Sequence, residues 1–154
     1  MMSAANLDGR RLEVEITESV LLEAEDAVLA AMKQLSARGV GFALDDFGTG
    51  YSSLNYLRRY PVGKIKIDRS FVVSLDKMLN ATIVHAVAAI GRSLGLKLVA
   101  EGVETVEQQR FLAAAGVHFM QGFLFGHPAP KQAITDRLEL ERGAASRALD
   151  GASG

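Results

Sequence analysis

The sequence predicts an α/β fold made of about five parallel strand–helix units, which is just over half of a closed (β/α) barrel. Short alternating or apolar stretches, typical of strands, are separated by longer stretches with apolar residues at helical spacing, and this order repeats along the chain. Polar residues follow the end of each predicted strand. An eight-stranded barrel typically takes roughly 250 residues, so the 154 residues suffice for only part of one.

Five short stretches have the patterns of strands. Leucine, valine and isoleucine alternate with polar residues in the first, the second is a continuous apolar run, and the third alternates lysine with isoleucine. The predicted strands are residues 12–17, 40–46, 64–68, 96–100 and 117–120.

The stretches between the strands carry the signals of helices and their ends. Gly39 and Gly95 stand where two helices should stop, Pro61 ends a short one, and Thr105 with Gln108 has the spacing of a capping box. The predicted helices are residues 20–38, 51–59, 76–94, a segment from 105 to about 116, and 131–141. Residues 1–141 are expected to form one domain, and residues 142–154, rich in Ala, Gly and Ser, a disordered tail.

Composition excludes several classes of protein. A net charge of −1 gives no basic field for a nucleic acid polymer, and the absence of cysteine excludes disulfides and thiolate metal sites. No apolar run approaches the roughly 18 residues of a membrane span, and no signal-peptide pattern is present. A cytoplasmic location is therefore expected.

The polar residues that follow the strands point to one site. In a parallel α/β sheet or barrel, the carboxyl ends of the strands share one rim, where such folds carry their sites. The residues at these ends are Glu15, Glu18, Asp45, Asp46, Lys66, Asp68, Glu101, Glu104 and Gln121. Carboxylates without thiolates suit Mg²⁺ or Mn²⁺, and metal ions held by carboxylates suit displacement at phosphorus. This predicts a metal-dependent phosphohydrolase or a sugar-phosphate enzyme, although Asp45 and Asp46 alone would also fit a solvated turn.

The motifs around these residues resemble a known family. Glu-Ile-Thr-Glu-Ser from Glu15, the ten-residue run from Asp45 to Leu54, Lys-Ile-Asp-Arg-Ser-Phe from Lys66, Glu-Gly-Val-Glu-Thr from Glu101 and Gln-Gly-Phe-Leu-Phe-Gly from Gln121 are similar to EAL domains, the cyclic diguanylate phosphodiesterases. The resemblance runs from about residue 7 to residue 130 and covers only the C-terminal portion of the family pattern. The Glu-Ala-Leu signature, with its metal-binding glutamate, is absent, as are a phosphate-gripping arginine and an asparagine ligand.

The resemblance implies a TIM-type barrel whose rim binds two Mg²⁺ or Mn²⁺ ions and opens cyclic diguanylate to the linear dinucleotide. It implies that Glu15 and Asp45 bind metal and that Asp46 holds the second metal. Lys66 would contact the attacking water or the second metal, and Glu101 would contact a metal or its water and act as a general base. Glu18, Glu104 and Gln121 would be supporting residues. The loop Phe47, Gly48, Thr49, Gly50, Tyr51 and Ser52 would link the site to a dimer interface.

Two functions from different classes remain open at this point. The first is the enzyme, expected to be truncated and to turn over slowly or not at all on its own because metal and substrate ligands are missing. The alternative is a non-catalytic EAL remnant that dimerises or docks on a partner through residues 47–54. A homodimer is expected in either case, and sensor or diguanylate cyclase domains would lie outside this chain. Asp68 is interpreted as a turn cap or a partner of Arg69, and His85, His118 and His127 lack the spacing of metal ligands.

Overall fold

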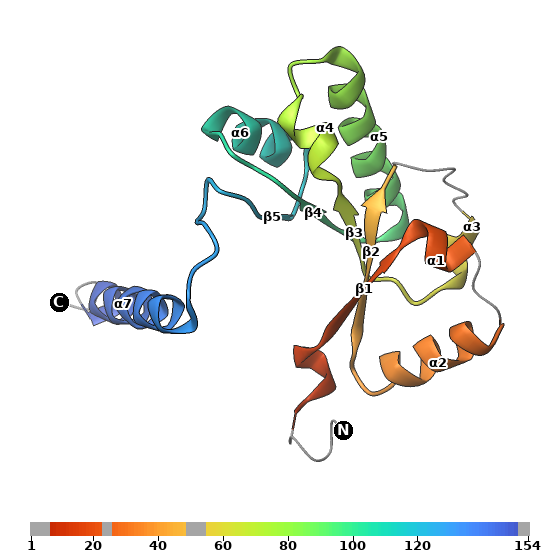
Figure 1. Ribbon diagram of the computed structural model, residues 1–154, viewed down its shortest axis with the longest axis horizontal. Coiled ribbons are helices and arrows are strands. Elements are labelled where there is room, and N and C mark those ends of the chain that lie inside the picture. Colours follow the sequence, from red (N-terminus) through yellow and green to blue (C-terminus); the bar gives the residue numbers. More distant parts are fainter. Residues whose placement is uncertain (1–6, 23–25, 49–54, 151–154) are drawn as a thin grey trace.

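Five parallel strands lie side by side in chain order in the computed structural model, which describes residues 7–22, 26–48 and 55–150 (Figure 1). The strands are β1 (Glu13–Thr17), β2 (Gly41–Phe47), β3 (Lys64–Ile67), β4 (Lys97–Ala100) and β5 (Phe119–Met120). Each strand pairs in parallel with the next, as in β1 with β2, where Glu15 lies opposite Ala43. The predicted α/β class and the partial barrel of about five units are confirmed.

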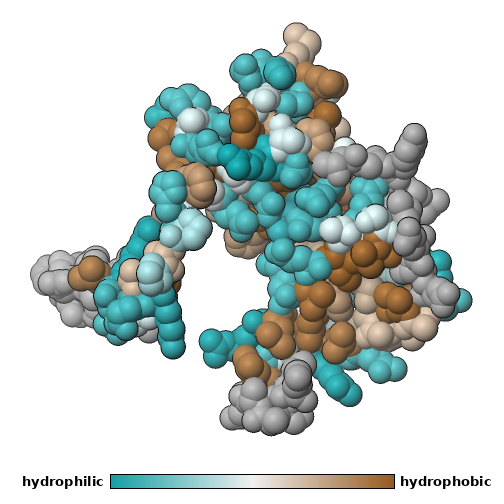
Figure 2. Space-filling model, viewed as in Figure 1, coloured by the Kyte–Doolittle hydropathy of each residue, from teal (hydrophilic) through white to brown (hydrophobic). Residues whose placement is uncertain are grey.

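Helices connect successive strands, as parallel pairing requires. The connecting helices are α1 (Glu18–Leu22), α2 (Asp26–Ser36), α3 (Asn55–Arg59), α4 (Arg69–Val73), α5 (Met78–Leu94) and α6 (Val106–Ala115). The 3₁₀ helix η1 (Gly9–Arg11) precedes β1, and α7 (Lys131–Asp150) follows β5. An open hollow separates α7 from the rest of the molecule in the space-filling view of Figure 2, and Ile134 and Leu138 of this helix are exposed.

Local signals in the sequence set several helix ends where they were predicted. Thr105 Oγ1 accepts a hydrogen bond from the Gln108 amide at 3.2 Å, and Gln108 Oε1 accepts one from the Thr105 amide at 3.0 Å, which closes the capping box of α6. Gly95 and Gly116 adopt left-handed backbone conformations at the ends of α5 and α6.

Other boundaries differ from the predictions. The segment predicted as one helix over 20–38 overlaps α1, which begins earlier, at Glu18, and contains α2; residues 23–25 lie outside the described part. The short helix α4 was not predicted; it begins after Asp68, whose side chain accepts a hydrogen bond from the Ser70 amide at 2.9 Å. Strand β5 begins at Phe119 rather than residue 117, and α7 continues through Asp150, where a disordered tail from residue 142 was expected.

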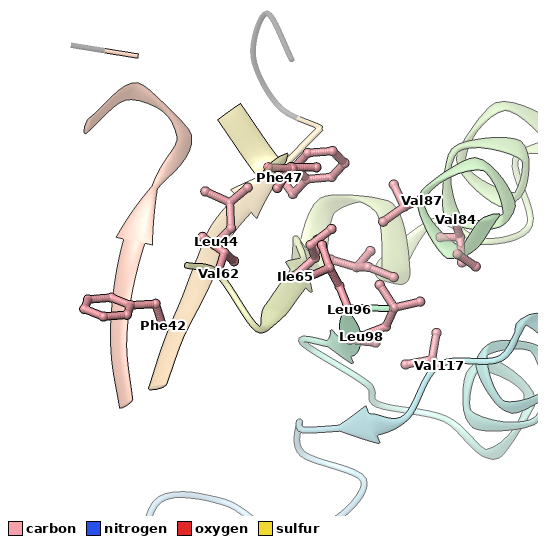
Figure 3. Close-up of a cluster of buried hydrophobic side chains, with 14 of the residues drawn as sticks. Phe42, Leu44, Phe47, Val62, Ile65, Val84, Val87, Leu96, Leu98 and Val117 are labelled. Atoms are coloured by element: carbon pink, nitrogen blue, oxygen red, sulfur yellow. The ribbon is translucent and has the colours of Figure 1, made fainter. Parts of the chain in front are cut away.

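The two faces of the sheet have opposite character because successive strand residues point to opposite sides. Leu44, Ile65 and Leu98 are fully buried on the face that the helices cover, together with Val84 of α5 (Figure 3). Lys64 and Lys66 occupy the other face, where Lys64 Nζ lies 2.7 Å from Glu13 Oε2. The apolar face therefore supplies the stability, and the polar face carries the charged residues.

The Leu44 side chain tests how much this core contributes. Replacing Leu44 by alanine leaves a cavity in a fully buried position, so we expect the free energy of unfolding to fall by about 3 kcal/mol. Urea unfolding measures the change. Leu140→Ala, at an exposed position of α7, should cost less than about 0.5 kcal/mol; equal losses would contradict this account of the core.

Candidate active site at the carboxyl ends of the strands

Lys66 lies at the centre of a cluster formed by residues from four neighbouring strands. Its Nζ atom is 2.7 Å from Glu15 Oε2 of β1, 3.0 Å from Asp45 Oδ1 of β2 and 2.6 Å from Glu101 Oε1, directly after β4. Gln121, directly after β5, donates from Nε2 to Glu101 Oε1 at 3.1 Å. The structure thus brings together one predicted site residue from each of the five strand ends.

The backbone fixes these five side chains relative to one another. The Glu101 amide donates to the Ile67 carbonyl at 3.1 Å and the Gln121 amide donates to the Ala100 carbonyl at 2.9 Å, so both residues continue the sheet ladder beyond the assigned strands. Side chains carried by paired strands are held in register without relying on loop conformation. This arrangement gives the site a rigid base.

Lys66 is almost completely buried, with 7% of its side chain exposed. Burial alone would lower the pKa of its ammonium group, but the hydrogen bonds with Glu101, Glu15 and Asp45 outweigh burial and raise the pKa above its usual value. Lys66 therefore stays protonated at neutral pH. It offers a fixed positive charge and N–H donors, and not a base, to any group bound at this rim.

Asp46 holds an unusual backbone conformation. Its φ of 54° lies in the left-handed region, which non-glycine residues seldom adopt, and the pairing of β2 with β3 shifts register between Leu44 and Phe47. Burial, and then the neighbouring charges of Asp45 and Asp68, raise the pKa of the Asp46 carboxyl. Strand β2 thus runs through both aspartates to Phe47, with an irregularity at the point where regular alternation would separate their side chains.

The predicted supporting residues have different surroundings. Glu18 is buried at the start of α1, and Glu104 forms an ion pair with Arg69 in which Oε1 lies 2.7 Å from Nη2. The alternative partner proposed for Arg69, Asp68, instead caps α4. Phe47 is buried and Gly48 has a φ of 94°, while Thr49, Gly50, Tyr51 and Ser52 lie outside the described residues.

A cleft of about 370 Å³ next to Gln121 was not predicted from the sequence. It is lined by Arg69, Gly102, Glu104, Gln121, Gly122, Phe123, Gly126, His127 and Pro128. Neither His127 nor Arg69 was among the predicted site residues. The signal that could have found the cleft is the pair of aromatic side chains set between glycines after the last strand, since glycine leaves space for a bound group.

The donor set fits a hard divalent cation in its chemistry. Carboxylate oxygens of Glu15, Asp45 and Glu101 already converge on one positive charge, and such oxygens are the ligands that Mg²⁺ and Mn²⁺ prefer. Within the described ranges, no three carboxylate or imidazole side chains surround a point that a metal ion could fill, because Lys66 lies between the carboxylates. Metal binding would therefore require the carboxylates to share their charge between Lys66 and the ion.

Residues 1–128 match the family described as EAL domain. The bifunctional diguanylate cyclase/cyclic di-GMP phosphodiesterase MucR of Pseudomonas aeruginosa is 50% identical over 130 residues, which are 84% of this chain and 19% of that protein. The cyclic di-GMP phosphodiesterase PdeR of Escherichia coli is 40% identical over 135 residues, 87% of this chain and 20% of that protein.

Solved structures show the same relationship. A structure described as the PaMucR phosphodiesterase in a c-di-GMP complex superposes with a TM-score of 0.82 and 48% identity, covering 86% of this chain and 54% of that one. A manganese/cy-diGMP complex of BlrP1 from Klebsiella pneumoniae gives a TM-score of 0.75 and 36% identity, covering 83% and 33%. The chain thus spans about one fifth of these two curated relatives and about half of the PaMucR chain. Among the described residues, no helix has the length and apolar character needed to cross a bilayer.

Proposed function

This chain belongs to the EAL domain family, and we propose that it carries the C-terminal part of the active site of a metal-dependent phosphodiesterase that hydrolyses cyclic diguanylate to linear pGpG. The observation that carries the proposal is the Lys66 cluster, in which three carboxylates from different strand ends converge on one buried ammonium group. Similarity to MucR and PdeR, both described as cyclic di-GMP phosphodiesterases, supports the substrate.

Glu15, Asp45 and Asp46 are the residues we assign to divalent metal binding, with Mg²⁺ or Mn²⁺ as the ion. When bound, such an ion supplies an activated water at neutral pH and neutralises charge on the phosphodiester. The manganese complex of BlrP1 supports this class of ion for the family. Without a metal ion, the carboxylates of this rim would outnumber the charge of Lys66 and would repel a substrate that carries two phosphodiester charges.

The remaining residues act on the phosphodiester and the water. Lys66 donates a hydrogen bond to a phosphoryl oxygen or to the attacking water, and its positive charge stabilises the charge that develops at phosphorus. Glu101 accepts the proton of that water at a carboxylate oxygen as the new P–O bond forms; the ester P–O bond breaks, and the leaving ribose oxygen takes a proton from solvent. Gln121, at 3.1 Å from Glu101 Oε1, holds the carboxylate in orientation.

We further propose that these 154 residues alone are a poor enzyme, because the Glu-Ala-Leu signature and its neighbouring arginine are absent from the sequence. We also propose that the chain forms a homodimer through the segment that follows Phe47 and that it is located in the cytoplasm. The much greater length of the relatives supports additional domains in the signalling proteins that use this fold.

Glu101→Gln tests the assigned chemistry. The amide keeps the shape of the side chain but cannot accept the water proton, so we expect any production of linear pGpG to fall about 100-fold or more. Turnover is measured by chromatography of the dinucleotide with Mg²⁺ or Mn²⁺. The matched control is Glu107→Gln, on the exposed surface of α6, which should leave turnover unchanged.

Two outcomes would count against this proposal. Measurable turnover that is equal in the wild type and in Glu101→Gln would remove Glu101 from the chemistry. Turnover of the wild-type chain as fast as that of a complete EAL domain would contradict the expectation that these residues lack part of the site.

A further inference from the structure

His118 stands directly before β5 and makes a contact that has no part in the chemistry described so far. Its Nδ1 atom accepts a hydrogen bond from the backbone amide of Leu98, in β4, at 3.2 Å. Its own backbone amide donates to the Leu98 carbonyl at 3.1 Å. A single residue therefore bonds to both backbone polar groups of Leu98, once through its ring and once through its main chain.

The Leu98 amide needs this acceptor because Leu98 is a fully buried residue of the core. A buried amide without a hydrogen-bond partner costs about as much free energy as a lost hydrogen bond. In a parallel sheet, the usual acceptor for such an amide is a carbonyl of the neighbouring strand. Here the imidazole nitrogen of His118 occupies the place of that carbonyl.

The end of α6 explains why a side chain takes this place. Gly116 ends the helix with a φ of 90°, and the amides of Gly116 and Val117 donate back to the Ala113 and Leu112 carbonyls, both at 3.0 Å. The backbone between α6 and β5 is thus committed to closing the helix, as in other helices that end at a left-handed glycine. The His118 ring completes the pairing with β4 at the point where the backbone leaves the helix end.

The contact with Leu98 also fixes the tautomer of the His118 ring. A nitrogen that accepts a hydrogen bond from an amide carries no proton of its own, and neutral imidazole has one donor nitrogen and one acceptor nitrogen. Because Nδ1 is the acceptor, the proton of the neutral ring lies on Nε2. The state of the ring therefore reports directly whether the contact with Leu98 is present.

Strand β5 has few attachments to the rest of the sheet. It is the last strand in the described sheet and contains two residues (Figure 1). His118 bonds to β4 before it, and the Gln121 amide bonds to the Ala100 carbonyl at 2.9 Å after it. Gln121 Nε2 also donates to Glu101 Oε1 at 3.1 Å, so the position of β5 on β4 determines the orientation of the Glu101 carboxylate.

We propose that His118 is a positioning residue: its Nδ1 atom anchors β5 to β4, and through Gln121 it holds the Glu101 carboxylate in place for the proton transfer. The role in the reaction rests on the proposed function, whereas the anchoring of β5 does not. His118 acts through Leu98 and Gln121 and touches neither the substrate nor the reacting atoms.

The tautomer of His118 in the wild-type chain tests the anchor without any substrate. Nitrogen-15 NMR distinguishes a protonated ring nitrogen from an unprotonated one, and the spectrum is recorded at about pH 8, where an ordinary histidine is neutral. We expect the proton on Nε2 and a scalar coupling between Nδ1 and the Leu98 amide nitrogen across the hydrogen bond. A ring that carries its proton on Nδ1 would overturn the proposal.

Two variants of similar shape separate the acceptor from the packing of the ring. Asparagine keeps an oxygen acceptor near the position of Nδ1, whereas leucine has the same branching and no acceptor. We expect His118→Leu to speed hydrogen exchange of the Leu98 and Gln121 amides about tenfold, the effect of one lost hydrogen bond, and His118→Asn to stay within about threefold of the wild type. The matched control is His85→Leu, at an exposed histidine of α5 that packs on Phe111, which should leave both amides unchanged.

Turnover tests the link from the anchor to Glu101. Where cyclic diguanylate is hydrolysed, kcat should fall about fivefold or more in His118→Leu with KM unchanged, and should recover in His118→Asn. Equal exchange rates in the two variants would overturn the anchor, and an unchanged kcat in His118→Leu despite faster exchange would overturn the link to Glu101. The expected exchange rates without turnover in any chain would support the anchor and count against the proposed activity alone.

Discussion

Replacing Lys66 by methionine is expected to lower the free energy of unfolding by about 2–3 kcal/mol. Methionine keeps most of the length of the lysine stem but removes the charge that Glu15, Asp45 and Glu101 share, so the three carboxylates repel one another at a partly buried position. This loss of stability is small for a broken buried ion pair because half of the Glu15 side chain is exposed to solvent. Urea unfolding in EDTA measures it.

The matched control for this substitution is Lys64→Met on the same strand. Lys64 forms a single ion pair among the described residues, with Glu13, and its Nζ lies 5.4 Å from the centroid of the Phe119 ring; about a third of its side chain is exposed, so its replacement should cost less than about 1 kcal/mol. Millimolar Mn²⁺ should recover more stability in Lys66→Met than in the wild type, because the cation would replace the missing charge among the carboxylates. Equal losses at Lys64 and Lys66, with no recovery by Mn²⁺, would show that the cluster is not a cation-binding arrangement.

Gly122→Ala is expected to lower the free energy of unfolding by about 3 kcal/mol. The new Cβ atom would lie 2.2 Å from the Val103 oxygen and 2.3 Å from the Val103 nitrogen, and these backbone atoms can move away only if the segments after β4 and β5 separate. The hydrogen bond from the Val103 amide to the Gln121 carbonyl would then weaken. Thermal and urea unfolding measure the loss.

Gly95→Ala separates this effect from backbone preference alone. Gly95 has a φ of 67°, and a Cβ atom there would meet nothing within 4 Å, so alanine should cost only about 1 kcal/mol. Comparable losses at the two glycines would mean that conformation, and not contact with Val103, determines the cost at Gly122.

Features that depend on neighbouring residues could be predicted from the sequence. The alternation of lysine and isoleucine over residues 64–68 placed Lys66 on the polar face correctly, because a strand has a fixed period of two. The capping box of α6 was equally predictable, since Thr105 and Gln108 need only a helical turn to meet. The rim followed from the parallel order of the strands, because that order alone brings Glu15, Glu101 and Gln121 to the same edge.

Features that depend on contacts between residues far apart in the chain could not be predicted from the sequence. Arg69 meets Glu104 across 35 positions of the chain, and no local pattern distinguishes this partner from Asp68, which caps α4. The positive φ of Asp46 coincides with the irregular pairing of β2 with β3, and the sequence, which indicated only a possible turn at Asp45 and Asp46, does not reveal that pairing. The cleft depends on the packing of Gly122 against Val103, which requires both segments to be in place.

The strand order β1-β2-β3-β4-β5 also bears on how this sheet assembles. Every strand pairs with its neighbour in the sequence, so no pairing has to wait for a remote segment, and the loop entropy lost at each step is that of one connecting unit. Each parallel pairing still has to close a crossover that contains a helix, and pairing of this kind forms slowly. Strand β3, with the buried Ile65 and Ile67, pairs with both β2 and β4, so the Lys66 cluster is complete only when β1, β2 and β4 have all been added to the same sheet.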